Sequence, residues 1–166
     1  MKKKQIFFTF LFLFFTVLTF SQKVRVKSGY VTVDEVNWIK CLEPANYTFS
    51  LLNKNDEEIV FIKMIVVQDA EPISQYNKDG SISYFVIKFL GLKKQFELQT
   101  NYKDVLKNLY LSKAINEDLT LNEEKIDLLV EKYGNEFSDK YSNRKSETVI
   151  IREEPRRSGV NINIGR

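Results

Sequence analysis

The chain has no histidine, one cysteine, three prolines and six isolated glycines among its 166 residues. The lack of histidine excludes Ser-His-Asp and Cys-His nucleophile systems, imidazole metal sites and histidine proton shuttles. The isolated glycines form no Gly-rich phosphate-binding loop. We therefore expect no cofactor and no metal site.

The single cysteine, Cys41, excludes an internal disulfide and a thiolate metal cluster built within the chain. A reactive thiol or an intermolecular bridge is the functional alternative for this residue. Because no histidine is present to activate the thiol, we favour a small buried residue in the core.

The first 21 residues have the order of a secretory signal peptide. Met1 to Lys4 carries three lysines, and an apolar run broken only by threonines extends from Ile6 to Phe20. Thr19 and Ser21 are small residues placed for cleavage before Gln22. The apolar run is short for a bilayer span, which needs about 20 residues. We predict export to the periplasm or the cell exterior, with an uncleaved N-terminal anchor as the alternative.

Cleavage would change the charge of the protein. The 25 Lys and Arg less the three lysines of the signal leave 22 basic side chains against 22 acidic ones. The mature chain is then formally neutral. Since a phosphate-binding surface needs an excess of basic groups, net charge gives no reason to expect a nucleic-acid partner.

Apolar runs separated by Asn, Asp and Gly turn signals dominate the middle of the chain and predict antiparallel strands. They cover residues 47–52, 59–67, 82–90 and 92–98. The second and third runs are apolar on both faces, as central strands are. The outer two alternate with polar residues such as Glu97, which we expect on a face turned to water.

The N-terminal part predicts a smaller hairpin. Lys23–Lys27 alternates between basic and apolar residues, and Ser28-Gly29 is a two-residue turn signal before Tyr30–Val33. The next segment, Asp34–Lys40, is ambiguous, and one helical turn is one interpretation of it.

Two helices are predicted after the sheet. Asn101 is a candidate N-cap for the first, and Thr120 begins a capping-box pattern, Thr120-Leu121-Asn122-Glu123, for the second. Gly134 is the expected C-cap of the second helix. Together these signals predict an α+β fold, with a meander of about four to six strands and the helices packed on one face.

The domain organisation follows from the same patterns. We expect a signal peptide at 1–21, a single α+β domain at 22–151, and a charged linker and tail at 152–166. The second face of the sheet also needs cover. The N-terminal hairpin, the tail, a partner and a ligand are the alternatives.

Candidate chemistry rests first on carboxylates. Asp69 and Glu71 flank a turn fixed by Pro72. A pair of acids across a cleft can hydrolyse glycosidic bonds, and clustered acids can bind a hard cation. Acidic residues at hairpin ends more commonly solvate the turn, which is the interpretation we favour.

Aromatic residues and the tail are the candidates for binding. Trp38 and Tyr76 are proposed members of a sugar- or peptide-stacking surface, the alternative being that such rings pack the sheet. Val160, Ile162 and Ile164 alternate with asparagines and match a strand that docks on a sheet edge of a partner, or a terminus that closes its own domain.

Three hypotheses follow for function. The first is a small exported protein that binds an envelope protein or a small ligand without catalysis. The second is a carboxylate-dependent hydrolase of envelope glycans. The third is a structural protein tethered to the membrane by an uncleaved N-terminal segment.

Overall fold

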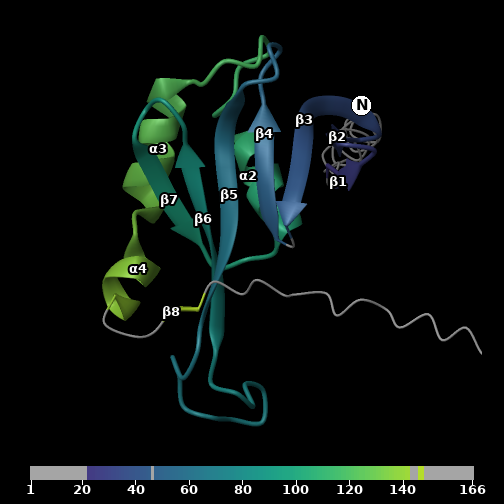
Figure 1. Ribbon diagram of the computed structural model, residues 1–166. Coiled ribbons are helices and arrows are strands. Elements are labelled where there is room, and N and C mark those ends of the chain that lie inside the picture. The colour runs from purple at the N-terminus through teal and green to yellow at the C-terminus, as the bar shows by residue number, and fades with distance from the viewer. Residues whose placement is uncertain (1–21, 46, 143–145, 148–166) are drawn as a thin grey trace, which may run out of the picture.

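A computed structural model describes residues 22–45, 47–142 and 146–147. The described chain is a run of strands followed by helices, with one further short strand (Figure 1). The elements are β1 (Val24–Lys27), β2 (Tyr30–Val33), β3 (Val36–Ala45), β4 (Thr48–Leu52), β5 (Glu58–Val67), β6 (Ile82–Phe89), β7 (Lys94–Leu98), α2 (Tyr102–Leu111), α3 (Glu123–Tyr133), α4 (Glu136–Tyr141) and β8 (Ser146–Glu147).

The sheet is an antiparallel meander in which each strand from β1 to β7 pairs with the next one in sequence. β8 joins it separately and pairs with Val66 and Val67 of β5. The predicted α+β class with an antiparallel sheet is confirmed. The number of strands is higher than the predicted four to six, because residues 36–45 form β3, where one helical turn was an interpretation, and β8 adds a short strand.

Two tight turns connect the first three strands. Ser28 and Gly29 have φ angles of 51° and 78°, so they form the predicted two-residue turn of the first hairpin. Asp34 and Glu35 have φ angles of 50° and 69° and make a second turn, with Val33 opposite Val36. The interpretation of 34–40 as a helical turn is therefore wrong, since the chain reverses at Asp34 and continues as β3.

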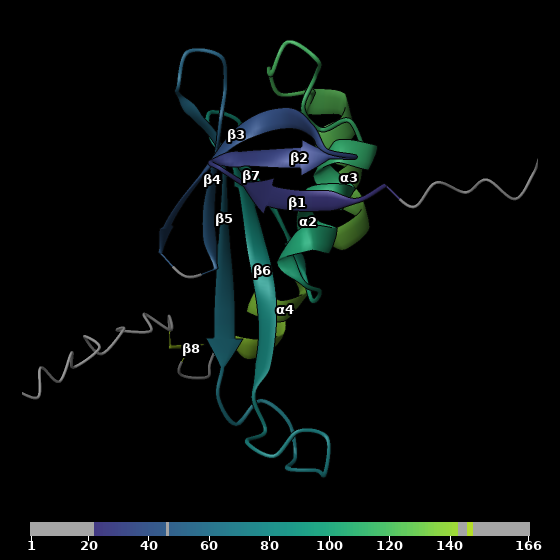
Figure 2. The same cartoon turned by 90° about the vertical axis from the view of Figure 1, so that its right-hand side faces the viewer.

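The main core lies between one face of the sheet and helices α2 and α3 (Figure 2). The sheet curls, so β1 and β2 run across the direction of β5 and β6 and β1 contacts α2. Side chains from both layers are fully buried here. They include Ile39, Leu51, Ile62, Ile87, Phe89, Phe96, Leu106, Leu109 and Ile126.

The helix ends are set by short polar side chains and a glycine. The side chain of Asn101 accepts a hydrogen bond from the backbone N–H of Asp104 at 3.1 Å, which confirms the predicted cap of α2. For α3, Asn122 is the cap and accepts from Lys125 N at 3.2 Å, so the cap predicted at Thr120 is two residues too early. Gly134 ends α3 as predicted, with a φ of 55°.

The second face of the sheet is partly covered by α4. After Gly134 the chain passes the edge of β7, where Glu97 N donates to Gly134 O at 3.0 Å. Phe137 of α4 then stacks on Tyr84 of β6, with 5.0 Å between ring centroids. Tyr141 joins the same small cluster beside β5 and β6. The two predicted helices, α2 and α3, do pack on one face, and the short helix α4, which was not predicted, packs on the other.

Glu97 holds α4 in this position and is only 1% exposed. One carboxylate oxygen accepts from Phe137 N at 3.0 Å and from Ser138 N at 2.9 Å, and the Ser138 hydroxyl donates to the other oxygen. The expectation that Glu97 faces water is wrong. The strand alternation does place it on the second face, but α4 covers that position.

Several predicted segments lie outside the described residues, namely the signal peptide at 1–21 and the linker and tail at 152–166. Within the described part of the chain, no helix has both the length and the apolar character needed to span a membrane.

Replacing Glu97 with Ala should lower the free energy of unfolding by about 3 kcal/mol, because buried N–H donors at the start of α4 lose a charged acceptor. Glu131→Ala, at an exposed position of α3, is the matched control and should change stability by less than about 0.5 kcal/mol. Denaturant unfolding measures both effects. Equal stability of the two variants, with unchanged hydrogen exchange at Phe137 and Ser138, would contradict this assignment.

Candidate functional site

The β5–β6 loop, residues 68–81, projects beyond the end of the sheet as a long arm (Figures 1 and 2). Its base is anchored in the small second-face cluster, where Ala70 packs with Ile82, Tyr84 and Tyr141. All four of these side chains are at least 91% buried. The arm therefore begins from a fixed platform.

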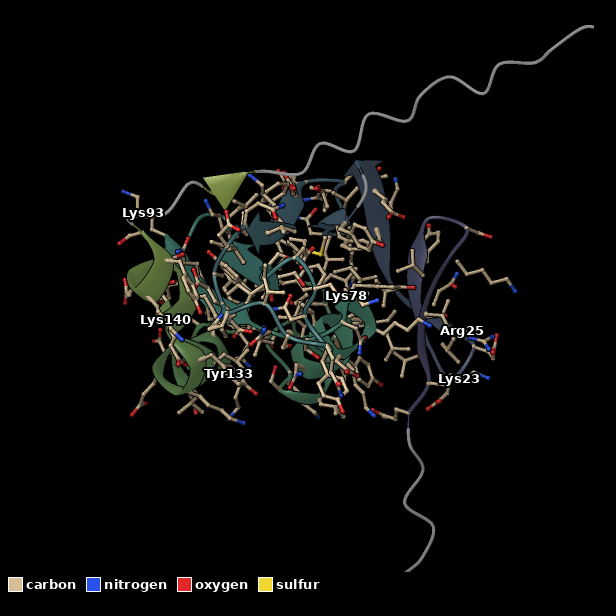
Figure 3. All side chains as sticks on the ribbon, turned by 90° about the horizontal axis from the view of Figure 1, so that it is seen from below. Lys23, Arg25, Lys78, Lys93, Tyr133 and Lys140 are labelled. Carbon is tan, nitrogen blue, oxygen red and sulfur yellow. The ribbon has the colours of Figure 1, made fainter. Side chains whose placement is uncertain are left out.

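A charged side chain of α4, Lys140, also interacts with a carboxylate of the loop. Lys140, labelled in Figure 3, has a raised pKa, mainly through a hydrogen bond with the Tyr141 side chain and further through the nearby carboxylates of Glu71 and Glu136. Glu71 belongs to the loop, so α4 contributes the Lys140 charge to the base of the arm in addition to the packing of Tyr141.

Hydrogen bonds within the loop fix its middle section. Glu71 N donates to Gly80 O at 2.9 Å, which pairs the two sides of the arm. The Asn77 side-chain amide donates to Glu71 Oε2 at 3.2 Å and to Ser81 O at 3.0 Å. Ser81 N in turn donates to the carboxylate of Asp79 at 3.1 Å, and this bond lowers the pKa of Asp79. The loop is thus held by its own polar groups.

The far end of the arm is a tight turn centred on Ser74. Ser74 N donates to Asn77 O at 2.9 Å, and Ser74 Oγ accepts from the backbone N–H groups of Tyr76 and Asn77. The turn presents two large apolar side chains to solvent. Ile73 is 75% exposed and Tyr76 is 91% exposed, the highest values among the large hydrophobic residues described.

Three of the residues predicted from sequence fall in this loop. Asp69 and Glu71 lie near its base and Tyr76 at its tip, and all three side chains are exposed. Sequence reasoning missed Ile73. A β-branched apolar residue within the polar segment between two strong strands was the available signal.

Trp38 lies elsewhere, on β3. It is half-buried and packs edge-to-face on Tyr110 of α2, with 5.1 Å between ring centroids and an interplanar angle of 81°. This is a packing contact between sheet and helix. The structure therefore does not bring Trp38 and Tyr76 into one stacking surface. Val160, Ile162 and Ile164 lie outside the described residues.

The carboxylates of Asp69 and Glu71 lie at the exposed base of the loop. Asp69, with a φ of 52°, occupies the first bend after β5, and Glu71 binds the Asn77 amide. Both are exposed, as acidic residues of turns usually are. Among the residues described, no group of three or more His, Cys, Asp or Glu is arranged to hold a metal ion.

Cys41 is a free, buried thiol on the core side of β3, as expected. Burial, with the Glu43 carboxylate nearby, raises the pKa of this thiol to about 11. The thiolate is the reactive form of cysteine. Cys41 therefore contributes packing volume, and its environment opposes nucleophilic chemistry.

Gly80 should be the residue most sensitive to substitution in the loop. Its φ is +65°, and an added Cβ would lie 2.5 Å from the backbone oxygen of Glu71. We expect Gly80→Ala to cost about 2–3 kcal/mol of unfolding free energy, from strain and the displaced Glu71–Gly80 pairing. Gly91→Ala is the control, since Gly91 has a φ of +88° with no atom within 4 Å of the added Cβ. It should cost about 1 kcal/mol. Equal losses in denaturant unfolding would show that the close approach is not limiting.

The raised pKa of Cys41 predicts slow modification of the folded protein. With a pKa of about 11, roughly 0.1% of the thiol is ionised at pH 8, and labelling by a disulfide reagent should quicken about tenfold per pH unit below that pKa. In guanidinium the thiol should react like an ordinary cysteine. Labelling at pH 8 that is as fast in the folded protein as in the unfolded chain would contradict the burial of this thiol.

The chain was compared with protein-family models, curated proteins and solved structures. No protein-family model matches the chain, and neither the curated proteins nor the solved structures include a match. Any functional conclusion must therefore come from the geometry of the described residues.

Proposed function

We propose that this protein is a small exported binding protein without catalytic activity, and that it contacts a protein partner through the tip of the β5–β6 loop. The observation that carries the proposal is the exposure of Ile73 and Tyr76, at 75% and 91%, on a loop fixed by its own hydrogen bonds. The periplasm or the cell exterior is the proposed location, on the strength of residues 1–21.

The hydrogen bonds that hold the loop in one shape favour binding to a partner. A flexible loop loses conformational entropy when it binds, whereas a loop already held in one shape loses less. Tyrosine is also enriched among residues that dominate binding energy at protein interfaces. The pair of Ile73 and Tyr76 supplies an aliphatic and an aromatic anchor at one end of the molecule.

Exposed apolar residues are common on protein surfaces and carry little weight singly. Leu111 of α2 and Leu128 of α3 are 56% and 52% exposed and are examples. The loop tip differs because its two apolar residues are more exposed, and because Tyr76 lies within the hydrogen-bonded turn 74–77 and Ile73 directly before it. These features favour the loop over the helices as the contact site.

The test uses the chain from Gln22 to Arg166 as bait against a native cell-envelope extract. An Ile73→Ser and Tyr76→Ser double variant should lose at least about tenfold in captured partner, as expected when two anchors are truncated. A Leu111→Ser and Leu128→Ser double variant is the matched control and should capture as much as the original chain.

A fourth bait ending at Arg152 tests the alternative site in the tail, which contains Val160, Ile162 and Ile164. Loss of capture with this bait alone would place the contact in the tail and contradict the loop. Equal capture by all four baits would also contradict it. If no bait retains a partner above background, the protein-binding function itself fails.

A further inference from the structure

A separate depression lies beside the turn between β6 and β7, at the opposite end of β6 from the β5–β6 loop. Its volume is about 470 Å³, which falls in the usual range for small-ligand pockets. Lys88, Phe89, Leu90, Gly91, Lys93, Lys94, Gln95 and Asn135 line it. We propose that this depression binds a small organic anion.

The charge of the lining carries the proposal. The lining holds three lysines and no acidic residue, although the predicted mature chain is formally neutral. This concentration of one sign of charge attracts an anion and disfavours a cation.

The three lysines have different roles. Lys94 Nζ is 2.8 Å from Glu123 Oε1 and 2.5 Å from Asp127 Oδ1 of α3, so its charge is balanced within the fold. Lys88 and Lys93 are exposed. Among the described residues, the ammonium group of neither side chain has a hydrogen-bond or ion-pair partner. Lys93 lies at the periphery of the molecule in Figure 3. These two ammonium groups are therefore available to a ligand.

Polar and apolar neighbours complete the site. Gln95 Nε2 donates to Asn135 Oδ1 at 3.0 Å, which fixes both amides at one wall. Among the described residues, the NH₂ group of Asn135 donates to no acceptor, so it can donate a hydrogen bond to a ligand. Leu90, which is 38% exposed, supplies an apolar wall. An anionic group flanked by a few carbon atoms fits this combination better than a bare inorganic ion.

The anionic group can be a phosphate or a carboxylate, and two probes separate these sources. The chain from Gln22 to Arg166, labelled with ¹⁵N, is titrated with glycerol 3-phosphate in one experiment and with citrate in the other. We expect saturating NMR shifts at the backbone amides of residues 90–93 and at the side-chain amides of Gln95 and Asn135. Saturation by either probe supports the site and identifies its preferred group.

A charge-reversal variant tests the lysines. Lys88→Glu with Lys93→Glu should weaken binding by at least about tenfold, as two ammonium contacts are replaced by repulsion. Lys27→Glu with Lys113→Glu makes the same change in net charge at two exposed positions away from the depression and should bind like the original chain. If the first double variant fails to fold by circular dichroism, Lys93→Glu alone tests the turn.

Two results would overturn the proposal. One is the absence of saturating shifts with both probes. The other is equal weakening by the two charge-reversal variants, which would show that only overall charge matters. Neither result bears on the loop tip, because Ile73 and Tyr76 are unchanged in these experiments.

Discussion

The carboxylate of Glu97 is the interaction on which the second face of this fold depends. It turns a position that would otherwise meet water into the anchor of α4, and α4 in turn brings Phe137 and Tyr141 onto β5 and β6. A buried carboxylate is tolerated only when hydrogen bonds replace its hydration. Here backbone N–H groups and a serine hydroxyl do so, and the same helix supports the base of the β5–β6 loop.

The two faces of the sheet therefore differ in how they are covered. One face packs on α2 and α3 and contains most of the large fully buried side chains. Among the described residues, the other face is covered in part by α4, a helix of six residues, and it leads to the loop with the most exposed large apolar side chains. The main core thus lies between the sheet and α2 and α3, whereas the proposed contact lies beyond the ends of β5 and β6.

Local signals predicted the class of fold well. Apolar runs, the Ser28-Gly29 turn and the Asn101 and Gly134 caps depend on a few neighbouring residues, so the sequence displays them directly. Glu97 and α4 could not be predicted in the same way, since about forty residues separate the carboxylate from the N–H groups that it accepts. For the site, Tyr76 and the two loop acids were named, but only the fold reveals that the Trp38 ring packs on Tyr110 instead.

The passage of the chain from α3 to α4 also bears on self-association. The Gly134 carbonyl accepts from Glu97 N and occupies hydrogen-bonding capacity along β7, so another strand is hindered from adding at that margin. The opposite margin is β1, a strand of four residues in which Arg25 pairs with Glu35 at 3.1 Å and Lys27 is exposed, preceded by the exposed Lys23. The charges of Lys23 and Lys27 disfavour pairing of this edge with a second copy. Both ends of the meander thus carry features by which natural sheets oppose edge-to-edge growth into fibrils.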